Sequence, residues 1–131
     1  MKRNAACSCG QLRVACEGEP VRISICHCLA CKRRTGSAFS YSVHYPRAQV
    51  TAIEGASSVF TRTGDSGNAA VFHFCPGCGT TVYWEPGGHP DRITLGVGAF
   101  ADPQFPPPRH SVYEIYKHDW VIMPPDVKHL E

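Results

Sequence analysis

The sequence predicts a mainly β fold made of short antiparallel strands, and three observations carry this prediction. Apolar and polar residues alternate in several short runs, with the period of half-buried strands. Turn-forming residues separate these runs, as in TGDSGN and EPGGHPD. No stretch has the spacing of an amphipathic helix, so we expect only single helical turns, at Lys32–Arg34 and Pro46–Gln49.

Alternation predicts a strand at Gln11–Cys16, in which Leu12, Val14 and Cys16 share one face. Cys16 stands apart from the other cysteines, and we interpret it as a small apolar core residue. Later strands are predicted by alternation or by their content of β-branched and aromatic residues. In chain order they are Val21–Ile25, Phe39–Tyr45, Val59–Arg62, Ala70–Phe74, Thr81–Trp84, Arg92–Phe100 and Ser111–Tyr116, and the chain is expected to continue extended from Ile25 to Cys28.

A chain of 131 residues suits one domain, and we expect residues 1–131 to form it. Leu130 and Glu131 resemble cloning residues and enter no functional argument. Charged residues make up only 18% and the net charge is +2, which disfavours nucleic acid and anionic membranes as partners and favours a small molecule. Met1–Gly10 has no apolar run behind its two cations, so we expect a cytoplasmic protein with neither secretion nor membrane insertion.

Eight cysteines in such a chain indicate metal binding rather than disulfide bonds, because a reducing compartment keeps thiols free. Seven of them fall into tight clusters with metal-ligand spacing. The clusters are Cys7-Ser8-Cys9, Cys26-His27-Cys28-Leu29-Ala30-Cys31 and Cys75-Pro76-Gly77-Cys78.

Two of the clusters together supply four thiols. Cys7 and Cys9 are expected to point the same way from one strand, because residues two apart share a face. The segment FCPGCGT favours a tight turn that brings Cys75 and Cys78 together, with backbone N–H groups aimed at the sulfurs. The sequence therefore predicts a closed, structural four-cysteine zinc site.

The remaining cluster supplies only three thiols. If the chain stays extended to Cys28, then Cys26 and Cys28 share a face, Cys31 folds back towards them, and His27 points away to a packing or hydrogen-bonding role. Three protein ligands with an open fourth position are typical of catalytic zinc, and a thiolate-rich zinc favours a substrate thiol as its exchangeable ligand. The cations that follow, Lys32, Arg33 and Arg34, are candidates to bind carboxylates on the carrier of that thiol.

The segments CSCGQLRV, CHCLACKRRTGSAFS, FCPGCGTTVYWE and ITLGVGAFADP resemble, in this order, the glutathione-dependent formaldehyde-activating enzymes. The resemblance implies a β-tent zinc fold with Cys7, Cys9, Cys75 and Cys78 as structural ligands. It further implies Cys26, Cys28 and Cys31 as the ligands of a second, catalytic-type zinc. The implied activity is that of a carbon–sulfur lyase, which adds the glutathione thiol to formaldehyde or a similar small aldehyde.

Two other functions stay open from the sequence. One is a noncatalytic zinc-binding interaction module of the same fold, as in relatives such as centromere protein V. The other is thiol redox chemistry similar to that of methionine sulfoxide reductase B, which would leave the second cluster free of metal. Candidates to line a substrate pocket are His27, His44, Tyr83 and Trp84, although aromatic residues on strands more often belong to the core.

Overall fold

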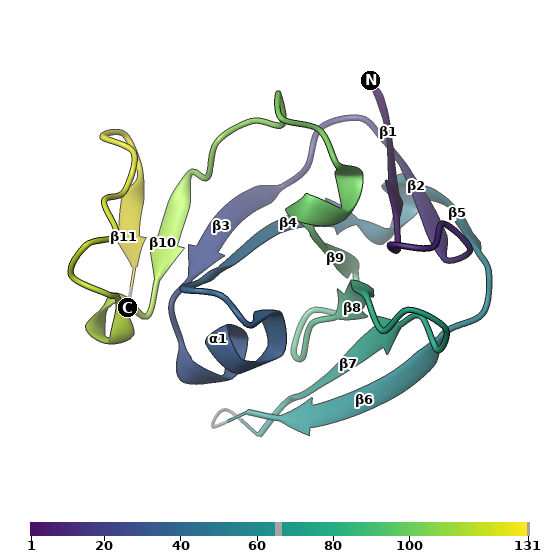
Figure 1. The fold of residues 1–131 in the computed structure, drawn as a ribbon. Helices are drawn as coiled ribbons and strands as arrows, with labels where there is room; N and C mark the ends of the chain where they lie inside the picture. The colour runs from purple at the N-terminus through teal and green to yellow at the C-terminus, as the bar shows by residue number, and fades with distance from the viewer. Residues whose placement is uncertain (65–66, 131) are drawn as a thin grey trace.

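A computed structural model describes residues 1–64 and 67–130, so Glu131 and the middle of the predicted TGDSGN turn lie outside the described residues. The chain forms two sheets (Figure 1). In spatial order the small sheet contains β1 (Lys2–Ala6), β2 (Arg13–Glu17) and β5 (Val50–Glu54). The large sheet contains β11 (Lys128–Leu130), β10 (His110–Val112), β3 (Arg22–Cys26), β4 (Ser40–Pro46), β9 (Arg92–Gly96), β8 (Thr81–Glu85), β7 (Ala69–Phe74) and β6 (Ser58–Thr63).

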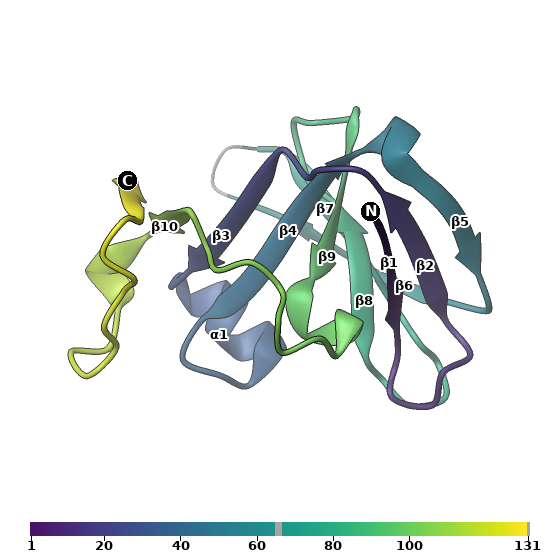
Figure 2. The same cartoon turned by 90° about the horizontal axis from the view of Figure 1, so that it is seen from above.

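The mainly β prediction is confirmed. Neighbouring strands pair antiparallel except around β10, which runs parallel to both β3 and β11. The large sheet curves from β3 and β4 round to β6 and β7, and the α-helix α1 (Leu29–Thr35) lies inside this curve (Figure 1). Figure 2 shows β3, β4, β9 and β8 side by side, with the small sheet beyond them. Among the residues that the structure describes, no helix has the length and apolar character needed to cross a membrane.

The two faces of the large sheet differ because its strands alternate. On β4, Val43 and Tyr45 are fully buried and pack with Leu12 and Val14 of the small-sheet side in the apolar core. Cys16 is fully buried in the same core, as predicted. The polar residues between the core residues of β4 face the inside of the curve instead. Along β4 the sheet therefore has an apolar face toward the small sheet and a polar face toward the inside of the curve.

The sequence underestimates the helix and overestimates the strand before it. β3 ends at Cys26 rather than continuing to Cys28, and α1 has seven residues rather than a single turn. The reason is an unusual cap: the Cys28 sulfur accepts a hydrogen bond from the Cys31 N–H at 3.3 Å and so begins the helix. Gly36 ends it in the left-handed conformation, with φ 63°.

Cys7 and Cys9 do not lie on a strand, which corrects the prediction for that pair. β1 ends at Ala6, and the two cysteines occupy the turn that leads into β2, where the Gly10 N–H donates to the Cys7 carbonyl at 3.0 Å. Gly10 has φ 83°, which glycine adopts without strain.

Some strand bounds also differ from those predicted. The strands β1, β5 and β11 were not predicted, and Leu130 is part of β11, paired with Val112. β9 stops at Gly96 and β10 at Val112, and each is followed by a 3-10 turn, Val97–Phe100 and Glu114–Tyr116. The single turn expected near Pro46 is present as the 3-10 turn Arg47–Gln49.

Candidate functional site

Four thiols from distant parts of the chain meet at one end of the small sheet. The sulfurs of Cys7, Cys9, Cys75 and Cys78 all lie within 4.8 Å of one another. The Cys7–Cys9 and Cys9–Cys75 sulfur distances are 3.5 and 3.7 Å. Sulfurs around one tetrahedral zinc, with bonds of about 2.3 Å, are separated by about 3.8 Å. Chemistry and spacing of these thiols therefore fit zinc.

Two similar turns hold the four thiols. In the second turn the Gly79 N–H donates to the Cys75 carbonyl at 2.8 Å, and Gly79 has φ 82°, which matches the turn at Cys7–Gly10. Each turn also aims a backbone N–H at its first sulfur: Leu12 donates to Cys7 and Gly77 to Cys75, both at 3.3 Å. These donors stabilise negative charge on the sulfurs and keep them in place.

Side chains link the two turns and favour the ionised form of two of the sulfurs, those of Cys75 and Cys78. The Gln11 amide donates to the Cys75 sulfur at 3.1 Å and, with the Cys78 N–H, lowers the pKa of that thiol. The Thr80 hydroxyl and N–H lower the pKa of Cys78 to about 5. Thr80 also accepts a hydrogen bond from the Ser8 N–H at 3.1 Å, which ties one turn to the other.

The second cluster is local. The sulfurs of Cys26, Cys28 and Cys31 lie within 4.8 Å of one another, at the end of β3 and the first turn of α1. Hydrogen bonds with Cys26 and Cys31 lower the pKa of Cys28 to about 2. Hydrogen bonds with Cys28 and Cys31 instead raise the pKa of Cys26. Ionisation is thus favoured at Cys28 and disfavoured at Cys26, and a cation bound among the sulfurs would favour the ionised form of both.

His27 lies outside this cluster of thiols. It is fully buried, its Nε2 lies 3.0 Å from the Ser111 hydroxyl, and its ring meets Phe39 edge to face. The His27 N–H donates to the Val112 carbonyl at 3.1 Å. The residue therefore joins the cysteine segment to β10, in the packing and hydrogen-bonding role expected for it.

A cavity of about 260 Å³ opens beside Cys26 and Cys31 on the inner face of the large sheet. Cross-strand pairing builds its floor: Cys26 lies opposite Ser40, and Ser24 lies opposite Ser42. The hydroxyls of these three serines have no hydrogen-bond partner within the described residues. The cavity therefore offers free hydroxyl groups close to the thiols.

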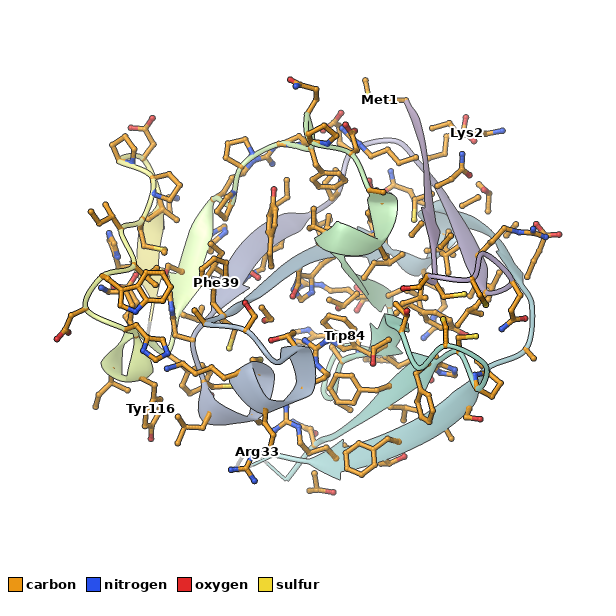
Figure 3. All side chains as sticks on the ribbon, in the orientation of Figure 1. Met1, Lys2, Arg33, Phe39, Trp84 and Tyr116 are labelled. Atoms are coloured by element: carbon orange, nitrogen blue, oxygen red, sulfur yellow. The ribbon has the colours of Figure 1, made fainter. Side chains whose placement is uncertain are left out.

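Of the cations that follow the cluster, only Arg34 lines this cavity. Its guanidinium lies 4.3 Å from the ring centre of Trp84 and 5.2 Å from that of Phe72. The Lys32 ammonium instead donates to the Tyr116 carbonyl, and Arg33 is exposed and points away from the inside of the curve (Figure 3).

Two of the four pocket candidates line the cavity, namely His44 and Trp84. Tyr83 does not, because it belongs to the opposite face of β8 and is buried in the apolar core. Sequence reasoning missed Arg22 and Arg62, which line the cavity from β3 and β6. Burial is the main cause that lowers the pKa of the Arg22 guanidinium, and repulsion from the positive charge of Arg92 lowers it further.

His44 gives the site a measurable dependence on pH. Burial, with Arg22 and Arg92 nearby, lowers its pKa from 6.5 to about 4. Between these values the unfolded chain binds a proton that the native protein does not, so the free energy of unfolding falls as pH drops below 6.5. From about pH 7 to pH 5 this loss should be about 2 kcal/mol.

The measurement is urea unfolding of the wild type and His44→Gln at both pH values, with zinc in excess. The variant should lose less stability on acidification than the wild type. Equal losses in the two proteins would show that His44 stays solvated and titrates normally.

Comparison with known proteins identifies the family and the fold of the chain. The family model described as "Glutathione-dependent formaldehyde-activating enzyme" matches residues 2–118. No curated protein matches the chain. The crystal structure of a Rhodobacter sphaeroides protein has the same fold, with a TM-score of 0.58 at 18% identity, covering 79% of this chain and 91% of that one. The family match spans both thiol clusters and most of the chain, which therefore belongs to the glutathione-dependent formaldehyde-activating enzyme family.

Proposed function

We propose that the protein is a zinc-dependent carbon–sulfur lyase that adds a glutathione-type thiol to a small aldehyde. The observation that carries this proposal is the convergence of three thiols beside a cavity that contains hydroxyl and guanidinium groups. Cys26, Cys28 and Cys31 would hold the zinc of this site. Cys7, Cys9, Cys75 and Cys78 would hold the structural zinc.

Zinc bound by the three thiolates would supply a place for the substrate sulfur and make that thiol acidic near neutral pH. Side chains of the protein would bind and orient the two substrates. Arg34, whose guanidinium lies over the Trp84 ring, is placed to bind a carboxylate of the thiol's carrier. The hydroxyls of Ser24 and Ser40 are placed to donate to the carbonyl oxygen of the aldehyde.

The reaction balances without another reactant. The sulfur forms a bond to the carbonyl carbon, and the π electron pair of the C=O bond moves to oxygen. The proton lost by the thiol ends on that oxygen, which gives an S-hydroxyalkyl product. Buried hydroxyl donors favour this step because negative charge develops on the oxygen as the carbon–sulfur bond forms.

Zinc content and glutathione binding test the proposal together. We expect two zinc ions per chain by elemental analysis, and a saturable heat of glutathione binding by calorimetry. Addition of ¹³C-formaldehyde should then produce S-hydroxymethyl signals in NMR faster than in buffer with glutathione alone. One zinc per chain with no glutathione response would contradict the lyase.

One observation favours the alternative, a noncatalytic zinc-binding interaction module. The C-terminal segment exposes Ile115, Trp120 and Ile122 by 85%, 71% and 89%, as at surfaces that meet another protein. The experiment above separates the two functions, because a module of this kind would bind zinc without accelerating the reaction of thiol and aldehyde.

A further inference from the structure

A second hollow lies between α1 and the hairpin of β6 and β7, and we call it the phenylalanine groove. Its volume is about 370 Å³. The hairpin contributes Phe60, Phe72 and Phe74 to its lining, and the helix contributes Ala30, Arg33 and Arg34. Figure 1 shows α1 next to this hairpin, inside the curve of the large sheet. An apolar cavity of about 150 Å³ suffices for a benzene ring, so the groove has room for a larger group.

Strand pairing aligns aromatic rings along the groove. Phe60 lies opposite Phe72 on β7, and Phe72 lies opposite Trp84 on β8. The ring centres of Phe72 and Trp84 are 5.4 Å apart, and both residues are buried. Phe60, by contrast, is 60% exposed on β6, the strand at the edge of the sheet. The row of rings therefore runs from the buried side of the candidate site out to a ring that is open to solvent.

The helix that forms the other wall of the groove is poorly packed. None of the seven residues of α1 is buried, although the helix lies inside the curve of the sheet (Figure 1). So short a helix is marginal by itself and depends on packing against the rest of the fold. The cap at Cys28 holds its first turn, whereas the side that carries Ala30 faces the open groove. An apolar group bound in the groove would supply the missing contact.

The groove is continuous with the candidate site on two sides. Ala30 and Arg62 also line an outer hollow that borders all three thiols of the local cluster. Arg34 and Phe72 also line the cavity beside these thiols. Ala30 has the small side chain at the boundary between the outer hollow and the groove. A molecule with one end at the thiols can therefore extend into the groove past Ala30.

The two reactants of the proposed addition differ in polarity, and this difference decides which of them the groove fits. The cavity beside the thiols contains serine hydroxyls with arginine and histidine side chains, so it suits the polar carrier of the thiol. Three phenylalanine rings suit a hydrocarbon group instead. Formaldehyde has no substituent and would leave the groove empty.

We propose that the phenylalanine groove binds the apolar substituent of an aldehyde whose carbonyl group lies at the three-thiol cluster. The substrate class is then an aldehyde with a hydrocarbon group the size of a phenyl ring or larger, such as phenylacetaldehyde. This inference deepens the proposed function and rests on it for the position of the carbonyl group.

Binding is tested with 2-phenylethanol, which has the carbon skeleton of phenylacetaldehyde but no carbonyl group. In ¹H–¹⁵N NMR spectra of the zinc-loaded wild type, the amide signals of Ala30 and Phe60 should shift saturably as this alcohol is added. Phe60→Ala should weaken the binding at least about fivefold, because it removes an aromatic wall of the groove. Val59→Ala is the matched control, since Val59 is 56% exposed on the opposite face of the same strand. Its affinity for the alcohol should match that of the wild type.

Turnover is tested with glutathione and either phenylacetaldehyde or formaldehyde, each initial rate being divided by the rate in buffer. The ratio of the two accelerations, phenylacetaldehyde over formaldehyde, should fall at least about fivefold in Phe60→Ala and keep its wild-type value in Val59→Ala. Zinc content equal to that of the wild type shows that both clusters are intact.

Two results would overturn the proposal: no shift of the groove signals with 2-phenylethanol, or an unchanged ratio of accelerations in Phe60→Ala. The alcohol cannot react with a thiol, so its binding reports on the groove even if the lyase chemistry is wrong. Saturable binding of the alcohol without acceleration of either aldehyde would contradict the proposed lyase while it supports the groove as a binding site for hydrocarbon groups.

Discussion

Replacing Cys78 with serine is expected to remove one zinc per chain and to lower the melting temperature by at least about 10 °C. The four-thiol cluster joins the turn before β2 to the turn before β8, and Cys9 and Cys75 are 66 residues apart in sequence. Serine is a poor zinc ligand, and three remaining thiolates would not hold these turns together. Elemental analysis and thermal unfolding followed by circular dichroism measure both effects.

Cys16→Ala is the matched control for this substitution, because it removes a buried thiol that belongs to neither cluster. It should keep two zinc ions per chain, although the small cavity that it creates costs some stability. A Cys78→Ser protein with unchanged zinc content and melting temperature would show that the four thiols do not form a metal site.

Replacing Cys31 with serine is expected to reduce activity strongly and thermal stability only slightly. The second zinc should be lost and the rate of thiol addition to formaldehyde should fall by about 1,000-fold, which corresponds to the several kcal/mol that a metal supplies at a reacting centre. The fold should survive, because all three thiols come from six consecutive positions and connect no distant strands. The melting temperature should therefore change much less than in Cys78→Ser.

The measurements are zinc content, thermal unfolding and the initial rate by ¹³C NMR. Loss of stability as large as that of Cys78→Ser would indicate that the local cluster is structural. Full activity without the second zinc would remove the three thiols from the chemistry.

The grouping of the cysteines was predictable because metal-ligand spacing is a local property of a sequence. Two residues between Cys75 and Cys78 suffice to indicate a turn that presents both thiols, whatever the rest of the fold. Most strands of the large sheet were also predictable from alternation. By contrast, β1 and β5 escaped detection, since much of their surface is exposed and their side chains show no clear apolar period.

The cavity could not be predicted because a polar side chain that alternates with core residues looks the same whether it faces water or an enclosed space. Ser42 and His44 alternate with Val43 and Tyr45, which indicates a strand but does not show what covers its polar side. Curvature of the sheet around α1 encloses that side. Arg62 reaches it only through the pairing of β6 with β7, and this pairing depends on contacts far apart in sequence.

The two thiol clusters also differ in when a growing chain completes them. Cys26, Cys28 and Cys31 leave the ribosome together, whereas Cys7 and Cys9 wait until Cys78 has been made. Closing that long loop costs more chain entropy than closing the short loop of the local cluster. Under the proposed zinc chemistry, nascent chains capture zinc at the local cluster before the structural site exists. A shortage of zinc during synthesis would then yield chains that carry metal and yet lack the link between their two sheets.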